Sequence, residues 1–238
     1  MARRARSAVG GVAHLVVLQA QAGRTVLHDE VDHAAFMHAL QESMSDVAVH
    51  GYGLASDQVR LLLRPATAQA LSRAMQALGR RFVAALHRRH GGTGSPWAGR
   101  FRAALIEPGE WTLWALRHVE RTGAPDGGFS SAAHRLGALP SLAGRPTDPP
   151  ELWSLGNTPF EREIAWRRLL EEPLPGPVLQ RLEAGCRSGA AVGSPAFMAA
   201  MADQLGRPLT PGRRGRPRGT GRPAPLDPTQ AGDAKTRH

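Results

Sequence analysis

Cysteine and tyrosine are each represented only once among the 238 residues of the chain. With Cys186 alone, the chain can form neither an internal disulfide nor a cysteine cluster for zinc, and we expect Cys186 to be a buried, small apolar side chain. No apolar run approaches the roughly 18 residues of a membrane-spanning helix, and Val9 to Val17 is too short and too interrupted for a secretory signal. The sequence therefore predicts a cytoplasmic protein with no membrane partner.

Lysine is almost absent as well, so arginine carries the positive charge. Lys235 is the only lysine, yet the formal net charge is +10 and the isoelectric point is about 11.4. Because a guanidinium group binds phosphate in a bidentate fork and stacks on bases, nucleic acid leads the list of expected partners. A GC-rich genome is another explanation for the abundance of Arg, Ala, Gly and Pro, although it does not explain the net charge.

The first half of the chain alternates between strand and helix periods of apolar residues. The predicted strands are residues 12–18, 47–54, 58–63 and 100–106, and the predicted helices are residues 34–44, 67–90 and 108–121. Asp29 and Asp32 precede the first helix as candidate caps, and Ala55 to Asp57 is typical of a hairpin turn. This order of elements resembles a ferredoxin-like split βαβ arrangement, an α+β fold in which helices pack on an antiparallel sheet.

The second half is less regular, because Gly and Pro accumulate at residues 123–128 and 139–150. Short helices are predicted at residues 160–170, 177–186 and 194–205. From Pro208 onward Arg, Pro and Gly dominate, and too few apolar residues remain to offset the entropy of ordering. The hydrophobic content of 42% supports one main domain with appendages. We predict a main domain at 1–137, a linker at 138–158, a helical accessory region at 159–206 and a disordered basic tail at 207–238.

Five segments of the main domain resemble one known family: Leu71–Phe82, Arg88–Gly91, Trp97–Arg102, Arg117–Glu120 and Ser130–His134. They resemble REP-associated tyrosine transposases, which are HUH-type single-tyrosine transposases of insertion sequences. The resemblance extends to about Gly137 and resumes at 185–206 and in the basic tail. It implies that residues 1–137 form a transposase-like DNA-binding domain.

The resemblance also implies a chemistry of DNA nicking and strand transfer. In such enzymes two histidines on a strand, separated by one residue, hold a divalent Mg or Mn ion. The ion neutralises charge on the phosphoryl oxygens, and a tyrosine on a later helix attacks the scissile phosphate. Each of these groups has its own position in the sequence, so each can be compared with the residue present here.

At all three catalytic positions this sequence departs from the family. The histidines align with Gln58 and Arg60, and the tyrosine aligns with His118. A Gln amide is a weak metal ligand, and Arg60 brings a fixed positive charge to the place of the cation. We therefore expect the metal site to be lost, no cofactor to be needed, and these positions to be non-functional. We interpret Asp57 as a turn former, and Tyr52, the only tyrosine, as a packing residue.

The candidate DNA-contacting residues are mostly arginines. They comprise Arg80, Arg81, Arg88, Arg89, Arg100, Arg102 and Trp97 in the main domain, and Arg214 and Arg216 in the tail. A phosphate-gripping surface with Trp97 stacked on an unpaired base is one interpretation, and a solvated helix face with a core tryptophan is the other. The tail segment Arg213 to Arg218 resembles an AT-hook that enters the minor groove, although a solvated charge run fits it equally.

The family's Arg-Gly signature after the first strand is replaced here by Gln19 to Gly23, which leaves the family's hairpin specificity open. The leading hypothesis is a catalytically inactive DNA-binding protein that recognises a single-stranded hairpin or AT-rich duplex. The resemblance leaves two assemblies open, a chain that acts alone and a homodimer. The alternatives are an active nicking and strand-transfer enzyme that uses substituted residues such as His118, an RNA-binding module, and a vestigial protein.

Overall fold

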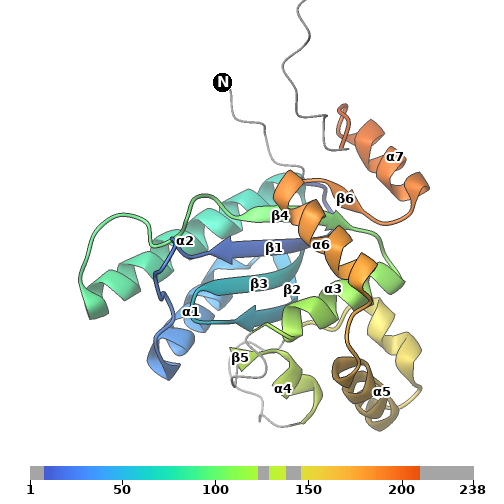
Figure 1. The fold of residues 1–238 in the computed structure, drawn as a ribbon, viewed down its shortest axis with the longest axis horizontal. Coiled ribbons are helices and arrows are strands. Elements are labelled where there is room, and N and C mark those ends of the chain that lie inside the picture. Colours follow the sequence, from blue (N-terminus) through green and yellow to red (C-terminus); the bar gives the residue numbers. More distant parts are fainter. Residues whose placement is uncertain (1–7, 123–128, 138–145, 210–238) are drawn as a thin grey trace, which may run out of the picture.

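The computed structural model describes residues 8–122, 129–137 and 146–209. A six-stranded sheet in the order β5-β2-β3-β1-β4-β6 forms its centre (Figure 1). The four strands at the middle of this order are β1 (Ala13–Gln19), β2 (Val47–Leu54), β3 (Gln58–Pro65) and β4 (Arg102–Ile106). Each is antiparallel to its neighbours among these four. The predicted α+β class, with an antiparallel split βαβ sheet, is confirmed.

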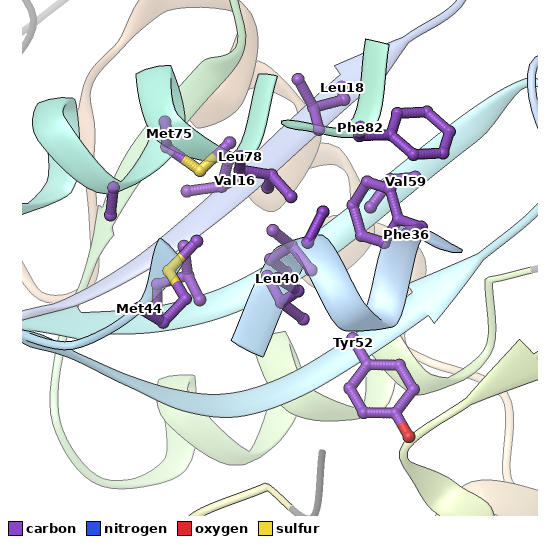
Figure 2. Packing of buried hydrophobic residues seen from close by; sticks show 14 of the residues in the cluster. Val16, Leu18, Phe36, Leu40, Met44, Tyr52, Val59, Met75, Leu78 and Phe82 are labelled. Atoms are coloured by element: carbon purple, nitrogen blue, oxygen red, sulfur yellow. The ribbon is translucent and has the colours of Figure 1, made fainter. Parts of the chain in front are cut away.

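Helices α1 (Glu30–Ser43) and α2 (Ala68–His90) cover one face of the sheet. Asp29 caps α1 by accepting hydrogen bonds from two backbone N–H groups, and Thr67 caps α2 in the same way from one. The buried face of α2 contains five large apolar residues that recur at helical spacing: Leu71, Met75, Leu78, Phe82 and Leu86. Figure 2 shows residues of both helices packed with Val16 and Val59 of the sheet.

The opposite face of the sheet is covered by helices α3 (Glu110–Glu120) and α6 (Gly176–Ser188), which share one apolar cluster with Leu15, Leu62 and Ala104 (Figure 1). Helix α5 (Pro159–Glu171) joins this cluster through Trp166, whose indole N–H donates to Glu120 of α3 at 2.8 Å. Of the accessory helices, α6 therefore packs directly on the strands of the main domain. Helix α7 (Pro195–Gln204) follows within the predicted range, and Ser194 caps it by accepting a hydrogen bond from the backbone N–H of Phe197. No helix among the described residues combines the length and the apolar character needed to cross a membrane.

The sequence did not predict the short elements: β5 (Phe129–Ser130), α4 (Ala132–Arg135), the 3₁₀ helix at Pro150–Leu155, and β6 (Ala191–Val192). Such short elements carry no readable period. Three predicted boundaries were also wrong. The first helix, expected from Ala34, begins at Glu30 with Asp29 as its cap, so Asp32 lies inside the helix. The helix expected from Pro108 begins at Glu110, because Gly109 lies at a φ of 89° outside the helical region, and the strand expected from Arg100 begins at Arg102.

Glycines on β2 set the distance between the sheet and α3. Gly51 and Gly53 alternate with Tyr52, so both face α3 while the tyrosine packs on the other side. A Cβ on Gly53 would lie 2.1 Å from the backbone oxygen of Val119, and one on Gly51 would lie 2.4 Å from the Leu116 side chain. Helix α3 can therefore approach β2 only because these positions lack side chains.

We predict that Gly53→Ala lowers the free energy of unfolding by about 1–3 kcal/mol, since the clash is with backbone that cannot rotate away. Gly79→Ala is the matched control. Gly79 lies inside α2 with nothing within 4 Å of its added Cβ, so the change should stabilise by about 0.5–1 kcal/mol. Urea denaturation of both variants measures the difference. Equal effects of the two substitutions would show that α3 does not lie this close to β2.

Candidate functional site

The three positions aligned with the family's catalytic residues lie on one face of the sheet. Gln58, Arg60 and Leu62 alternate along β3 toward the same side, and Leu62 packs in the cluster formed with α3 and α6. His118 belongs to α3, on that side, and the Arg60 charge acts on its imidazole. One Arg60 nitrogen donates a hydrogen bond to Thr122 Oγ1 at 3.3 Å, just beyond the end of α3. The fold therefore brings together positions 60 residues apart in sequence.

His118 is held as a neutral imidazole. It is only 5% exposed. Burial, together with the positive charge of Arg60, lowers its pKa from 6.5 to about 3. At neutral pH the ring therefore carries no charge, and the local positive charge belongs to arginine.

A second guanidinium lies on the same face as Arg60. Val17 of β1 is paired with Arg60 on one side and with Arg102 of β4 on the other, so the three side chains form a row across three strands. Burial lowers the pKa of Arg60, while Glu183 of α6 and Cys186 oppose this. Arginine remains protonated at any physiological pH, so the row presents two fixed positive charges.

Helix α6 contributes neighbours that sequence reasoning did not assign to this site. Both Arg60 and Arg102 act electrostatically on Cys186, whose pKa burial raises to about 12. Cys186 is buried, as expected, and its thiol lies 3.5 Å from the backbone oxygen of Leu15. No signal in the sequence pointed to Glu183 or Thr122, because their positions depend on how α6 and α3 pack.

Hydrogen bonds from side-chain amides connect Gln58, Gln19 and Asp57 at the end of β3. The Gln58 side chain donates to Gln19 Oε1 at 2.6 Å, and the Gln19 side chain donates to the backbone oxygen and to Oδ2 of Asp57, at 3.0 and 3.2 Å. The amide of Gln58 is thus engaged, and a cation stands at Arg60. These residues do not fit a divalent metal ion.

Tyr52 cannot take the place of the missing nucleophile at this site. Its side chain lies on the α1 and α2 side of the sheet, and its hydroxyl is 2.9 Å from His134 Nε2. Burial raises its pKa to about 12. Its role is to pack the core, as the sequence suggested.

The other candidate arginines do not form one surface with Arg102. Arg80, Arg81 and Arg88 line a shallow groove between α1 and α2, on the side of the molecule away from Arg60. Some of them are already paired: Arg81 contacts Glu42 at 3.1 Å, and Arg89 contacts both Asp29 and Asp32 at 2.5 Å.

Trp97 and Arg100 lie beside a small pocket at the end of the sheet near α2. Trp97 is 7% exposed, and its ring centroid lies 6.0 Å from that of Phe82. This placement favours the packing role over a stacking role. Arg214 and Arg216 lie outside the described residues.

No family model and no curated protein matches this chain. In fold it is similar to a REP-associated tyrosine transposase bound to a REP hairpin, at 13% identity and a TM-score of 0.49, covering 63% of this chain and 100% of that one. It is similar to a protein of Deinococcus radiodurans assigned as a transposase, at 20% identity and a TM-score of 0.31, covering 45% and 88%. A bacterial tRNA(His) guanylyltransferase-like protein in complex with ATP is similar at 12% identity and a TM-score of 0.34, covering 49% and 60%. Likenesses this distant leave the function to be argued from the residues themselves.

We predict that His118 contributes to acid sensitivity. Its folded-state pKa of about 3 lies below the unfolded value of 6.5, so its stabilisation is complete above pH 6.5 and is lost as the pH falls toward 3. In His118→Gln, the stability lost between pH 6.5 and about 4.5 should be smaller by about 2 kcal/mol.

Urea denaturation at several pH values measures this loss. His38→Gln, at an exposed position on α1, is the control and should leave the pH dependence unchanged. His14, whose pKa burial lowers to about 4, accounts for part of the loss that remains. An identical pH profile for His118→Gln and the parent protein would contradict the assignment.

Proposed function

We propose that this chain is a transposase-related DNA-binding protein that holds a DNA phosphate without cutting the strand. The observation that supports this is the row of Arg60 and Arg102 across Val17, next to the neutral His118. In the resembled family this face holds the metal ion and the scissile phosphate. Here two guanidinium groups occupy it.

The chemistry of the row suits phosphate. Guanidinium groups bind phosphoryl oxygens through paired, charge-assisted hydrogen bonds, and partial burial strengthens them relative to contacts in water. Arg60 is half-buried and Arg102 is exposed, so a strand arriving from solvent meets Arg102 first. An unpaired strand of a hairpin is the favoured ligand, because its backbone can bend into a site flanked by α3 and α6.

We expect Arg60→Ala and Arg102→Ala each to weaken binding to a single-stranded DNA hairpin. Each variant should lower the slope of log K against log salt by roughly 0.7, the value for one phosphate contact on a single strand. Arg73→Ala is the matched control, since Arg73 lies on α2 with its guanidinium 4.0 Å from Asp46 and 70% exposed. Binding is measured by fluorescence anisotropy across salt concentrations.

The ligand panel separates the competing functions. It contains the hairpin, AT-rich duplex, random duplex and matched RNA. A preference for RNA would replace the proposal with an RNA-binding function, and equally weak binding to every ligand would indicate a vestigial basic domain. An unchanged salt slope in both arginine variants would remove the phosphate row from the interface.

Catalysis is tested separately with Mg²⁺ or Mn²⁺ present. The parent protein should give no nicked product and no covalent protein–DNA adduct, because no metal ligand or tyrosine stands at the aligned positions. An adduct that disappears in His118→Ala would establish the alternative of an active enzyme with histidine as nucleophile. Denaturing gels of a labelled hairpin detect both products.

Restoring the aligned residues tests the loss of the metal site. The triple variant Gln58→His, Arg60→His and His118→Tyr should gain Mn²⁺ binding, because alternating strand positions place both imidazoles on one face. Gln58→His alone is the control and should gain none while the Arg60 cation remains. Calorimetric titration with Mn²⁺ measures the gain. Equal Mn²⁺ binding by Gln58→His and by the triple variant would show that Arg60 does not exclude the ion.

A further inference from the structure

A second cluster of titratable side chains lies on the other side of the sheet, between the start of α1 and the end of α2. Asp32 Oδ2 is 3.0 Å from His28 Nδ1 and 3.0 Å from His90 Nε2. The three ligand atoms all lie within 4.8 Å of one another. Among the described residues, no other group of three or more His, Cys, Asp or Glu side chains comes together in this way.

We propose that His28, Asp32 and His90 form a binding site for a divalent transition-metal ion, and that Zn²⁺ is the ion their chemistry fits. Two imidazoles and one carboxylate are a ligand set that zinc takes with a fourth position left to water. Ligand atoms about 2.0–2.1 Å from a tetrahedral ion stand about 3.3 Å apart. The two 3.0 Å separations need only a small movement to reach that value.

The cluster combines a fixed carboxylate with reachable imidazoles. Asp32 is 2% exposed, whereas the side chains of His28 and His90 are 43% and 31% exposed. An ion can therefore approach from solvent and keep a water ligand. The two imidazoles belong to different helices: His28 lies just before the start of α1, and His90 is the last residue of α2.

Neighbouring groups hold the carboxylate in place. Its Oδ2 accepts a hydrogen bond from the backbone N–H of His28 at 2.9 Å, and its Oδ1 accepts one from Arg89 at 2.5 Å. Arg89 is in turn paired with Asp29. Such outer contacts orient a ligating carboxylate. His90 Nε2 lies 2.9 Å from Oδ1 and 3.0 Å from Oδ2, and Oδ2 is the oxygen that is near both imidazoles. The Arg89 guanidinium is 3.4 Å from His90 Nε2, and its own partners are Oδ1 and Asp29.

The consequence of binding is a cross-link between the two helices. Each helix supplies one end to the site, so an ion would tie the first turn of α1 to the last turn of α2. The polypeptide after His90 leads through Gly91 toward Trp97 and β4, and the ion would fix the point at which this segment departs. This inference does not depend on the proposed DNA-binding function.

Titration of the full chain, without a histidine tag, with Zn²⁺ tests the proposal. We expect one ion per chain by elemental analysis after dialysis, and a rise in Tm on adding Zn²⁺. His28→Ala and His90→Ala should each weaken Zn²⁺ binding at least about tenfold, since even outer-shell substitutions cost about that much. His38→Ala, an exposed histidine of α1 beside Glu42, is the matched control and should bind as the parent does.

Cobalt gives a readout that a purely hydrogen-bonded network would not. Co²⁺ bound by two imidazoles and a carboxylate should show the intense visible absorption of a four-coordinate ion, and this band should be absent in His28→Ala and His90→Ala. Far-UV circular dichroism establishes that both variants are folded. If the parent binds no Zn²⁺, or if His28→Asn and His90→Gln bind it as tightly as the parent, the cluster is a hydrogen-bonded helix contact and the proposal is wrong.

Discussion

The arrangement of the candidate site depends on the close approach of α3 to β2. Gly51 and Gly53 have no side chains, so α3 packs directly against the backbone of β2. A Cβ on Gly53 would lie only 2.1 Å from the backbone oxygen of Val119. This close approach places His118 at the level of Arg60, which is paired with Gly53 in the register. A larger residue at either glycine would lift α3 and separate the imidazole from the guanidinium.

Replacing a divalent metal ion with a guanidinium keeps the sign of the charge at a site, lowers its magnitude and changes its chemistry. A cation fixed on β3 attracts phosphate and holds it by hydrogen bonds about 2.7–2.9 Å long. It offers no open coordination position and cannot be exchanged. The neighbouring imidazole adds no charge of its own, because burial and Arg60 keep its pKa at about 3. Under the proposed function, this face would therefore hold a phosphate by charge and hydrogen bonding and not through a metal ion.

Local patterns predicted the layers of the fold and could not predict which face a charge occupies. The apolar spacing of α2 identified its buried side, including Leu78 and Phe82, because burial repeats with the helical period. Sequence reasoning grouped Arg80 and Arg102 as candidate DNA contacts, although they lie on opposite sides of the sheet. That separation depends on which side of β4 faces α6, a tertiary property.

The candidate site was predictable only in part for the same reason. The alignment with the resembled family indicated Gln58, Arg60 and His118, which the fold brings onto one face. It gave no indication of Glu183 or Cys186, because α6 lies far along the chain. His28 and His90 are likewise separated by two helices and two strands, α1, β2, β3 and α2, and nothing in their local sequence marks them as neighbours.

Both borders of the sheet end in strands of two residues, β5 beside β2 and β6 beside β4. Such short border strands present few free backbone N–H and C=O groups, so they make a poor template for another polypeptide chain. Within the described residues, the sheet is therefore closed to growth by strand addition. Among the described residues, the surfaces that remain for a contact between two copies of the chain are therefore those of helices and loops.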